Sequence, residues 1–424
     1  MEHPTTIYRS IRKRRERRII GQQAGERQGV ADTRTDQGKN GREAEADSGK
    51  RIYRLVLSGY YGFKNSGDEA VLKSILTALE EAAAAAGAKV EPVVLSGDPE
   101  WTARQYGVEA VPRMKLAEVR RALKASDGLI SGGGSLLQDA TGLGSIPYYL
   151  GIMELARWCG KPTFVYAQGI GPVNRAMFKP LIARAFKRAQ YVSVRDEESA
   201  ALLRGYGVPA SRVEVVPDPV MGLPPGGQGA DDEGGAGEGD TLPVVGVSVR
   251  FWRSDRADLD RAAAALEALA ARGVRARLRF LPFHRGADED ASRYVMERLA
   301  RAGAYSEREL ELAPAHDDPQ RMLREVGRCA LLIGMRLHSL IYAANREVPL
   351  LGISYDPKID QFLQRLGEKA IGSTEALDAQ AAAARAEEIL RDPDLWKGEK
   401  QDAIRRLKEE AAKPSQQILS FIRN

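Results

Sequence analysis

Short apolar runs alternate with amphipathic stretches from residue 53 onward. Runs rich in Val, Ile and Leu are typical of buried strands, and they lie at Tyr53–Ser58, Val90–Leu95, Gly128–Ser131, Thr163–Ala167, Tyr191–Val194 and Val213–Val216. Helical patterns lie between most of them, at 67–86, 116–125, 147–159, 175–189 and 196–205. This alternation predicts a parallel sheet covered by helices on both faces.

The pattern breaks at residues 222–242, which are rich in Gly, Pro and Asp, and then resumes. In the second series we predict strands at Val244–Val249, Arg275–Leu281, Ala330–Ile333 and Pro349–Ile353. We predict helices at 258–272, 287–302, 318–327, 337–345, 357–366 and 377–391, with a last helix near 397–412 that packs back across the first domain. The break indicates a flexible linker or a long surface loop.

A chain of 424 residues is longer than one typical core, so two domains are expected. The predicted fold class is α/β, with two Rossmann-like, doubly wound domains facing a cleft. The predicted parts are a disordered tail at 1–50, a first domain at 51–221, the linker at 222–242, a second domain at 243–392 and a C-terminal helix at 393–424.

Charge is concentrated in the tail. Residues 1–50 hold 12 Lys and Arg against 8 Asp and Glu, whereas the rest of the chain holds 51 against 50. The folded part is therefore nearly neutral, which argues against nucleic acid as a partner. The basic cluster Arg12–Arg18 suits contact with an anionic membrane face, although an inert tail or an over-long start is the simpler explanation.

The remaining bulk features favour a cytoplasmic location. Cys159 and Cys329 have apolar neighbours and no CxxC spacing, which indicates free thiols in a reducing compartment. No apolar run approaches the roughly 18 residues that span a bilayer. No hydrophobic stretch follows the basic cluster, so we expect no secretory signal.

Because parallel strands bind ligands beyond their carboxyl ends, polar residues that follow the first-domain strands are candidates. Asp68 and Glu69, after Gly67, open a helix. Together with Asn65 they suit hydroxyl recognition, or the acidic pair only complements the helix dipole. Three glycines, Gly132, Gly133 and Gly134, offer backbone N–H groups to oxygen anions or form only a tight turn. Further candidates follow the next two strands: Gln168, Arg175 and Arg195.

The second half carries the sharpest pattern. Arg336 and His338 follow an apolar strand at a helix start, within Gly334-Met335-Arg336-Leu337-His338-Ser339. Arginine presents a planar fork to phosphate or carboxylate, and histidine transfers protons near neutral pH. Lys358 begins the next helix, behind the Asp356 cap and Pro357. His284 also follows a strand and is a weaker candidate. No metal-binding motif is visible.

These motifs and their order resemble the bacterial polysaccharide pyruvyl transferases. The likeness rests on YYGFKNSGDEAVL, SGGGSLLQD, QGIGPV, VRDEES, VVPDPV and GMRLHSLIYAANREVPLLGISYDPKI and covers about 53–392. It is greatest to the type that pyruvylates cell-wall polymers for S-layer anchoring. The resemblance implies a GT-B-like architecture of two Rossmann-like domains.

The resemblance also implies the reaction. A pyruvyl unit passes from phosphoenolpyruvate, a co-substrate with no other cofactor, to two hydroxyls of a sugar, and phosphate is released. In the cell-wall type the acceptor is N-acetylmannosamine of a lipid-linked precursor, ketalised at O4 and O6. This places the enzyme transiently at the inner membrane face. The positions expected to hold and activate the donor are Arg175, Arg336, His338 and Lys358, with Arg195 as the alternative to Arg175.

Roles follow from the chemistry of the donor, which carries a phosphate and a carboxylate. We expect His338 to act as general acid/base, Arg336 and Arg175 to bind donor anions and Lys358 to assist phosphate departure. Arg195, Ser339 and Gly334 complete the predicted donor side. The predicted acceptor side consists of Asn65, Asp68, Glu69, Gly132, Gly133, Gly134 and Gln168. The alternatives are a GT-B glycosyltransferase using a nucleotide sugar and a non-catalytic sugar-binding scaffold.

Overall fold

The computed structural model describes residues 50–139, 142, 144–226 and 242–424. The predicted tail with its Arg12–Arg18 cluster and most of the predicted linker, 227–241, lie outside the described residues. The first residues of that linker are held in place. Leu223 is buried, and the carbonyl oxygens of Pro224 and Pro225 accept hydrogen bonds from Gln320 and Arg324 at 2.9 Å each.

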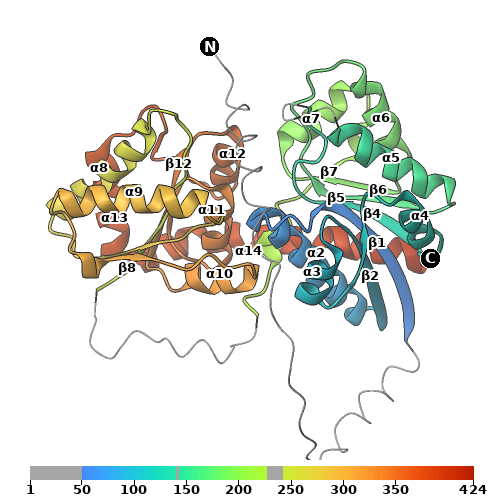
Figure 1. The fold of residues 1–424 in the computed structure, drawn as a ribbon, viewed down its shortest axis with the longest axis horizontal. Coiled ribbons are helices and arrows are strands. Elements are labelled where there is room, and N and C mark those ends of the chain that lie inside the picture. The colour runs from blue at the N-terminus through green and yellow to red at the C-terminus, as the bar shows by residue number, and fades with distance from the viewer. Residues whose placement is uncertain (1–49, 140–141, 143, 227–241) are drawn as a thin grey trace, which may run out of the picture. The chain divides into compact units, whose positions relative to one another are not determined.

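The described part of the chain contains two parallel sheets, each flanked by helices (Figure 1). The first sheet has the order β3-β2-β1-β4-β5-β6-β7. Its strands are β1 (Arg51–Tyr61), β2 (Ala88–Ser96), β3 (Glu109–Pro112), β4 (Gly128–Gly132), β5 (Thr163–Gln168), β6 (Tyr191–Val194) and β7 (Glu214–Val215). Its helices are α2 (Ser66–Ala85), α3 (Pro99–Tyr106), α4 (Leu116–Lys124), α5 (Ser145–Trp158), α6 (Phe178–Arg188) and α7 (Glu197–Gly205), with short 3-10 helices η2 (Ala210–Arg212) and η3 (Pro219–Gly222).

The second sheet repeats this winding with the order β10-β9-β8-β11-β12-β13. Its strands are β8 (Val244–Ser248), β9 (Arg277–Phe280), β10 (Leu310–Leu312), β11 (Leu331–Gly334), β12 (Leu350–Ser354) and β13 (Gly372–Ser373). Its helices are α8 (Ala257–Ala271), α9 (Ala287–Arg301), α10 (Pro319–Gly327), α11 (Leu337–Asn345), α12 (Pro357–Arg365), α13 (Ala379–Arg391) and α14 (Pro393–Arg423), with the 3-10 helix η5 (Glu307–Glu309).

Strand order defines where each sheet binds ligands. The order reverses between β1 and β4 in the first sheet and between β8 and β11 in the second. Loops leave such a reversal point in opposite directions and open a crevice at the carboxyl ends of the strands. The fold therefore provides two crevices, one per sheet.

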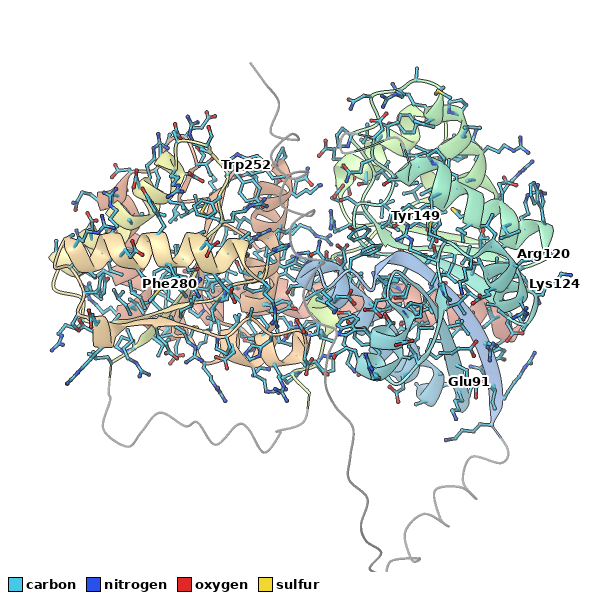
Figure 2. All side chains as sticks on the ribbon, in the orientation of Figure 1. Glu91, Arg120, Lys124, Tyr149, Trp252 and Phe280 are labelled. Carbon is cyan, nitrogen blue, oxygen red and sulfur yellow. The ribbon has the colours of Figure 1, made fainter. Side chains whose placement is uncertain are left out.

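Apolar side chains of the strands form the cores. Phe280 on β9 is fully buried, whereas Trp252, which follows β8, is half exposed (Figure 2). Truncating a buried aromatic such as Phe280 to alanine costs about 3–5 kcal/mol of stability. Helix α14 returns to the first sheet, as predicted, and the ring of Phe421 meets that of Phe164 on β5 at 5.4 Å.

Asn345 fixes α11 to the segment that leaves the first sheet. Its buried amide nitrogen lies 3.0, 2.9 and 2.9 Å from the carbonyl oxygens of Val220, Met221 and Leu223 in and after η3. Helix α11 begins beside His338, and η3 begins beside Asp218. The clamp thus sets the position of a second-domain helix against a first-domain carboxylate.

Several predicted boundaries were wrong. The short edge strands β3, β10 and β13 and helix α3 were not predicted, because two to four edge residues present no apolar run and α3 is mostly polar. The helix predicted from 175 begins at Phe178. The last helix runs through Pro414 to Arg423, beyond the predicted end near 412.

Candidate active site

The crevice of the second sheet places Arg336 and His338 at one helix start. Gly334, the last residue of β11, pairs with Ser248 of β8 and Gly352 of β12. Arg336 is then the N-cap of α11, and His338 lies in its first turn. The partial positive charge of the helix N-terminus adds to the charge of Arg336, so this point favours an anion.

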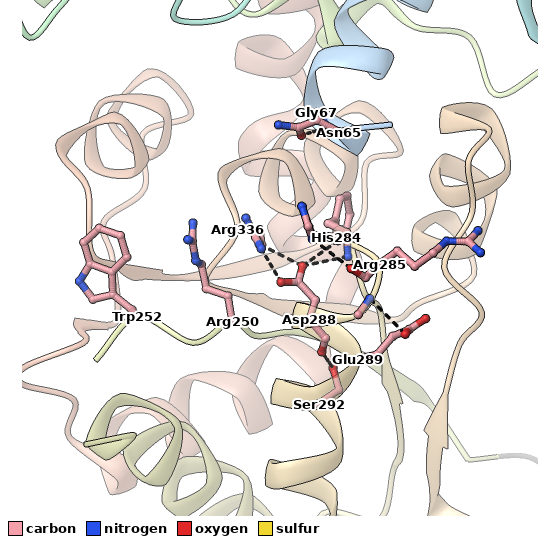
Figure 3. A network of polar contacts seen from close by, with 12 residues as sticks. Asn65, Gly67, Arg250, Trp252, His284, Arg285, Asp288, Glu289, Ser292 and Arg336 are labelled. Carbon is pink, nitrogen blue, oxygen red and sulfur yellow. Dashed lines mark hydrogen bonds and ion pairs between the residues drawn. The ribbon is translucent and has the colours of Figure 1, made fainter. Parts of the chain in front are cut away.

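A buried carboxylate holds Arg336. Its Nε lies 3.0 Å from Asp288 Oδ2 and its Nη2 contacts Asp288 Oδ1, giving a two-pronged pair (Figure 3). Asp288 is fully buried and also accepts from the backbone N–H groups of Phe283 and His284. The guanidinium is therefore oriented and largely compensated in charge, with Nη1 as its remaining nitrogen.

His338 lies against residues of the first sheet. Its Nε2 is 3.8 Å from Oδ2 of Asp218, is buried and makes no hydrogen bond within the described residues. A Cβ on Gly67, at the start of α2, would lie 2.6 Å from Cε1 of His338, so glycine permits this approach. Burial lowers the pKa of His338, Asp218 opposes that shift, and Arg195 and Arg336 add to it. The imidazole is thus neutral at pH 7.

Arg195 and Lys358 meet at Ser135. Arg195 Nη2 donates to Ser135 Oγ at 3.0 Å, and Lys358 Nζ, at the start of α12, donates to the same oxygen at 3.3 Å. Arg195 also pairs with Asp218 at 3.4 Å and Asp196 at 3.8 Å. We call Asp68, Ser135, Arg195, Asp218, His338 and Lys358 the His338 cluster. Three of these residues, Arg195, Asp218 and Lys358, line a pocket.

Asp68, in the first turn of α2, faces this cluster. Burial, Glu69 and Asp218 raise its pKa to about 7, and Arg195 opposes them. Its Oδ1 is so near Gly134 that a Cβ there would lie 2.8 Å away. A carboxyl group that is half protonated at neutral pH therefore lies in the same cluster as a neutral imidazole, which is the arrangement that acid–base catalysis needs.

Sequence reasoning missed Asp218. Its carboxylate is buried, contacts Arg195 and His338, and accepts a hydrogen bond from the backbone N–H of Val220 at 3.1 Å. An Asp before a Pro is typical of a helix cap, and Asp218 does cap η3. The sequence did offer one signal: Asp218 follows a strand closely, as Arg195 and His338 do.

Two residues of the predicted acceptor side have structural partners. The Asn65 side chain caps α2 by accepting from Gly67 N at 3.2 Å. The buried Glu69 accepts from Gly62 N at 2.9 Å, Lys64 N at 3.2 Å and the Tyr106 hydroxyl at 2.8 Å. Glu69 therefore holds the β1–α2 loop, and its neighbour Asp68 is the carboxyl group that faces the cluster.

The glycine loop after β4 is a close-packed turn. Gly133 donates its N–H to the Tyr166 carbonyl at 2.9 Å, so this N–H is not available to an anion, which favours the predicted alternative of a tight turn. Gly132 accepts from the Tyr61 hydroxyl at 2.8 Å, and Gly134 accepts from Gly169 N at 2.9 Å. Gln168 is fully buried, its Oε1 accepts from Ser131 Oγ at 3.4 Å, and its Nε2 makes no hydrogen bond within the described residues.

Three predicted donor residues also differ from expectation. The hydroxyl of Ser339 donates to the Arg336 carbonyl at 2.6 Å, and a Cβ on Gly334 would lie 2.5 Å from that hydroxyl. Both residues therefore shape the turn into α11. Arg175 is about half exposed and pairs with Asp139 at 3.6 Å. Within the described residues, no contact joins Arg175 to the His338 cluster, whereas Arg195 belongs to it.

An aromatic surface lies beyond β1 and β3. The exposed rings of Tyr60 and Phe63 stack with centroids 4.1 Å apart. The Arg113 guanidinium lies over Phe63 at 5.3 Å and over Tyr148 at 4.2 Å. Exposed stacked rings are suited to the apolar face of a sugar. The YYGF run signalled these rings in the sequence, but the contribution of Arg113 depends on the fold.

The described residues contain neither a membrane-spanning helix nor a metal-binding group of side chains. No helix is both long and apolar enough to cross a bilayer. No group of three or more His, Cys, Asp or Glu side chains there is arranged to hold a metal ion.

Two Rossmann-like domains, with residues of both in one polar cluster, define the GT-B class of folds. Solved structures of this class resemble the chain. A glycosyltransferase from Rickettsia africae gives a TM-score of 0.59 at 12% identity, covering 88% of this chain and 98% of its own. HepE from Anabaena, solved with UDP-glucose, gives 0.55 at 14%, covering 87% and 99%. UDP-GlcNAc 2-epimerase from Neisseria meningitidis, bound to UDP-GlcNAc, gives 0.53 at 11%, covering 88% and 100%.

The fold does not identify the family of the chain, but the sequence does. The polysaccharide pyruvyl transferase family model matches residues 65–357, which contain every residue of the His338 cluster except Lys358. The chain belongs to the polysaccharide pyruvyl transferase family. No curated protein matches it in sequence.

Proposed function

We propose that this protein transfers the pyruvyl group of phosphoenolpyruvate to two hydroxyls of one sugar and releases phosphate. One observation carries the proposal: in the His338 cluster a neutral imidazole and a carboxyl group with a pKa of about 7 lie among the cations Arg195 and Lys358. Membership of the family supports the same reaction class. The cations suit an anionic donor, and the acid–base pair suits proton transfer to and from carbon and hydroxyl oxygen.

The donor lies on the second-sheet side of the cluster. Phosphoenolpyruvate carries a phosphate and a carboxylate, so more than one cation must face it. Arg336 and Lys358 start neighbouring helices and supply two of these cations. We assign the first-sheet cation to Arg195 instead of Arg175, because Arg195 shares Ser135 with Lys358.

The protons balance with two titrating groups. Protonated Asp68 donates to C3 of the donor, which becomes the methyl group, while the first sugar hydroxyl adds to C2 and passes its proton to His338. As the bond from C2 to the phosphate oxygen breaks, His338 returns that proton to the phosphate. The second hydroxyl then adds to C2, and its proton restores Asp68. The products are one ketal and one phosphate, and both groups regain their starting state.

The acceptor lies on the first-sheet side. Gln168 supplies an unused buried donor, and the stacked Tyr60 and Phe63 rings supply an apolar surface for a sugar ring. We propose N-acetylmannosamine of a lipid-linked cell-wall precursor, ketalised at O4 and O6, as the acceptor, and S-layer protein anchoring as the use of the product. The lipid carrier would bring the protein to the inner membrane face, and residues 1–50 with Arg12–Arg18 are the proposed contact.

In the test, the full chain is mixed with phosphoenolpyruvate and an acceptor, a diphospholipid-linked disaccharide that contains N-acetylmannosamine. We expect phosphate release that depends on the acceptor, together with a product heavier by one pyruvyl ketal in mass spectrometry. The same chain is offered UDP-sugars, because solved neighbours of the fold carry UDP ligands. Nucleoside diphosphate release without phosphate release would replace the proposal with a glycosyltransferase. Acceptor binding with neither product would indicate a scaffold.

The membrane contact has a separate test. Full chain and a chain lacking residues 1–50 are sedimented with vesicles containing anionic phospholipid. We expect deletion to reduce the bound fraction and added salt to reduce binding of the full chain, because charge attraction to lipid headgroups is screened. Equal sedimentation of the two chains would disprove a role for the tail.

A further inference from the structure

Within the described residues, Arg250 is a cation of the second crevice that contacts no carboxylate. Within the described residues its contacts are a hydrogen bond from Nη1 to the Tyr355 hydroxyl at 3.0 Å and the faces of two rings. Its Nε is buried and makes no hydrogen bond there. A partly buried guanidinium loses hydration, and a neutral hydroxyl does not balance its charge.

Three other arginines that follow strands of this sheet pair with carboxylates. Arg336 pairs with buried Asp288. Arg285, after β9, pairs with Asp317 at 3.1 Å, and Arg253, three residues beyond Arg250, forms two hydrogen bonds of 3.0 Å with Asp255. Arg256, further along the same loop, lies over the rings of Phe251 and Tyr294 and forms no ion pair within the described residues, but it is exposed. Arg250 differs from it in being partly buried while its charge is left unbalanced.

Arg250 occupies the point where strand order reverses. Ser248 of β8 pairs with Gly334 of β11, so Arg250 and Arg336 stand two residues beyond paired positions on neighbouring strands. Neighbouring strands are about 4.8 Å apart. Tyr355 follows β12 on the other side of β11, and Arg250 reaches it across the end of that strand. Figure 3 shows the Arg250 and Arg336 side chains next to each other and pointing to the same side.

Two rings set the orientation of this guanidinium. Its carbon lies 5.3 Å from the centroid of Trp252 and 5.1 Å from that of Tyr355, and the two rings contact each other at 4.5 Å. Ring faces attract a cation and restrict its rotamers without neutralising it. The result is a pre-oriented fork with unused hydrogen-bond donors, which suits a ligand with several anionic oxygens.

We propose that Arg250 binds an anionic group of phosphoenolpyruvate and is the uncompensated cation of the donor site. This rests on the proposed function, because it takes that donor as the ligand. Arg336 and Arg195 already face carboxylates, so their net contribution to binding a trianion is smaller than their number suggests. Arg250 supplies the excess positive charge, and Trp252 and Tyr355 keep it in place.

The first test compares Arg250→Gln and Arg250→Met with Arg253→Gln in steady-state phosphate release. Methionine preserves an apolar stem against the two rings. We expect both Arg250 variants to raise KM for phosphoenolpyruvate about 10- to 100-fold, the effect of losing a hydrogen bond to a charged group, with kcat within about threefold. The matched control Arg253→Gln should leave KM within about twofold, because that side chain is paired with Asp255. An unchanged KM in the Arg250 variants would overturn the proposal.

A second measurement uses only the wild-type protein and so does not depend on whether a variant folds. Wild-type protein is treated with phenylglyoxal, which modifies arginine, with and without saturating phosphoenolpyruvate, and the modified peptides are quantified by mass spectrometry. We expect phosphoenolpyruvate to protect Arg250 and leave Arg253 reactive. Equal modification of Arg250 in both samples would overturn the inference about Arg250. The proposed function would still stand if the same protein turned over phosphoenolpyruvate. Wild-type protein that releases no phosphate and gains protection of Arg250 only from UDP would instead overturn the proposed function.

Discussion

The two sheets share one winding order but differ in the groups at their carboxyl ends, although the first also supplies Arg195 to the His338 cluster. The first crevice presents carboxyl groups, a buried amide and exposed rings, including Asp68, Gln168 and Tyr60. The second presents Arg250, Arg336 and Lys358 at the ends of β8, β11 and β12. Equivalent backbones thus position different ligands, because the loops after the strands, not the strands, choose the chemistry.

The contrast separates recognition of an anion from recognition of hydroxyl groups. Cations gather where the proposed trianionic donor binds, and neutral or acidic groups gather where the proposed sugar hydroxyls approach. His338 belongs to the second sheet but lies against Gly67 and Asp218 of the first. The reaction therefore needs both crevices, and variants on either side should fail in different ways.

The largest effect is expected at the meeting point of the two crevices. His338→Gln removes the group that accepts and returns a proton, so turnover should fall about 100- to 10,000-fold. His284→Gln is the matched control, because His284 also follows a strand but is exposed, and it should stay within about threefold. Phosphate release measures turnover, and melting temperature checks the fold. Normal turnover of His338→Gln would remove it from the mechanism.

The variant Asp68→Asn tests the role of the first crevice through the pH dependence of turnover. Because the raised pKa keeps Asp68 partly protonated near pH 7, wild-type turnover should decline above about pH 7. The variant should lose roughly 100-fold in turnover and lose that alkaline decline. Above the pKa of Asp68 in the unfolded chain, the buried carboxyl group destabilises the wild-type fold because it must ionise or stay protonated at a cost. The melting temperature of the variant should therefore exceed that of the wild type by more at pH 8 than at pH 4. An alkaline decline kept in the variant would assign it to another group.

A pair of arginine variants tests which cation of the first sheet belongs to the donor site. Arg195→Gln should reduce kcat/KM for phosphoenolpyruvate about 10- to 100-fold, because it leaves Asp218 unpaired and removes a charge from the cluster. Arg175→Gln should change it less than about threefold, since that side chain is exposed and pairs with Asp139. The reverse ranking in the same assay would restore the assignment of Arg175.

The smallest effect is expected at the aromatic surface. Tyr60→Ala and Phe63→Ala should each raise KM for the acceptor about fivefold, the factor for about 1 kcal/mol of lost ring stacking. KM for phosphoenolpyruvate should not change, because the rings lie on the first-sheet side. An equal rise in both KM values would show that the two crevices do not separate donor from acceptor.

Much of the fold was predictable because it depends on local pattern. Buried parallel strands read as apolar runs, and all but the short edge strands were predicted. The cap Asp356 and the turn glycines were also visible as sequence signals, whereas the capping role of Asn65 was not predicted. The His338 and Lys358 positions followed from one rule, that ligands bind beyond the carboxyl ends of strands.

Tertiary structure alone decided which side chains are free to act. Sequence cannot show that Asp288 pairs with Arg336 or that Glu69 holds a loop, because their partners lie tens of residues away or depend on burial. It likewise could not separate Arg195 from Arg175, or find Asp218 and Arg250, since each role depends on contacts across strands and between sheets. Sequence fixes the type and order of functional groups, whereas burial and pairing set their charge and availability.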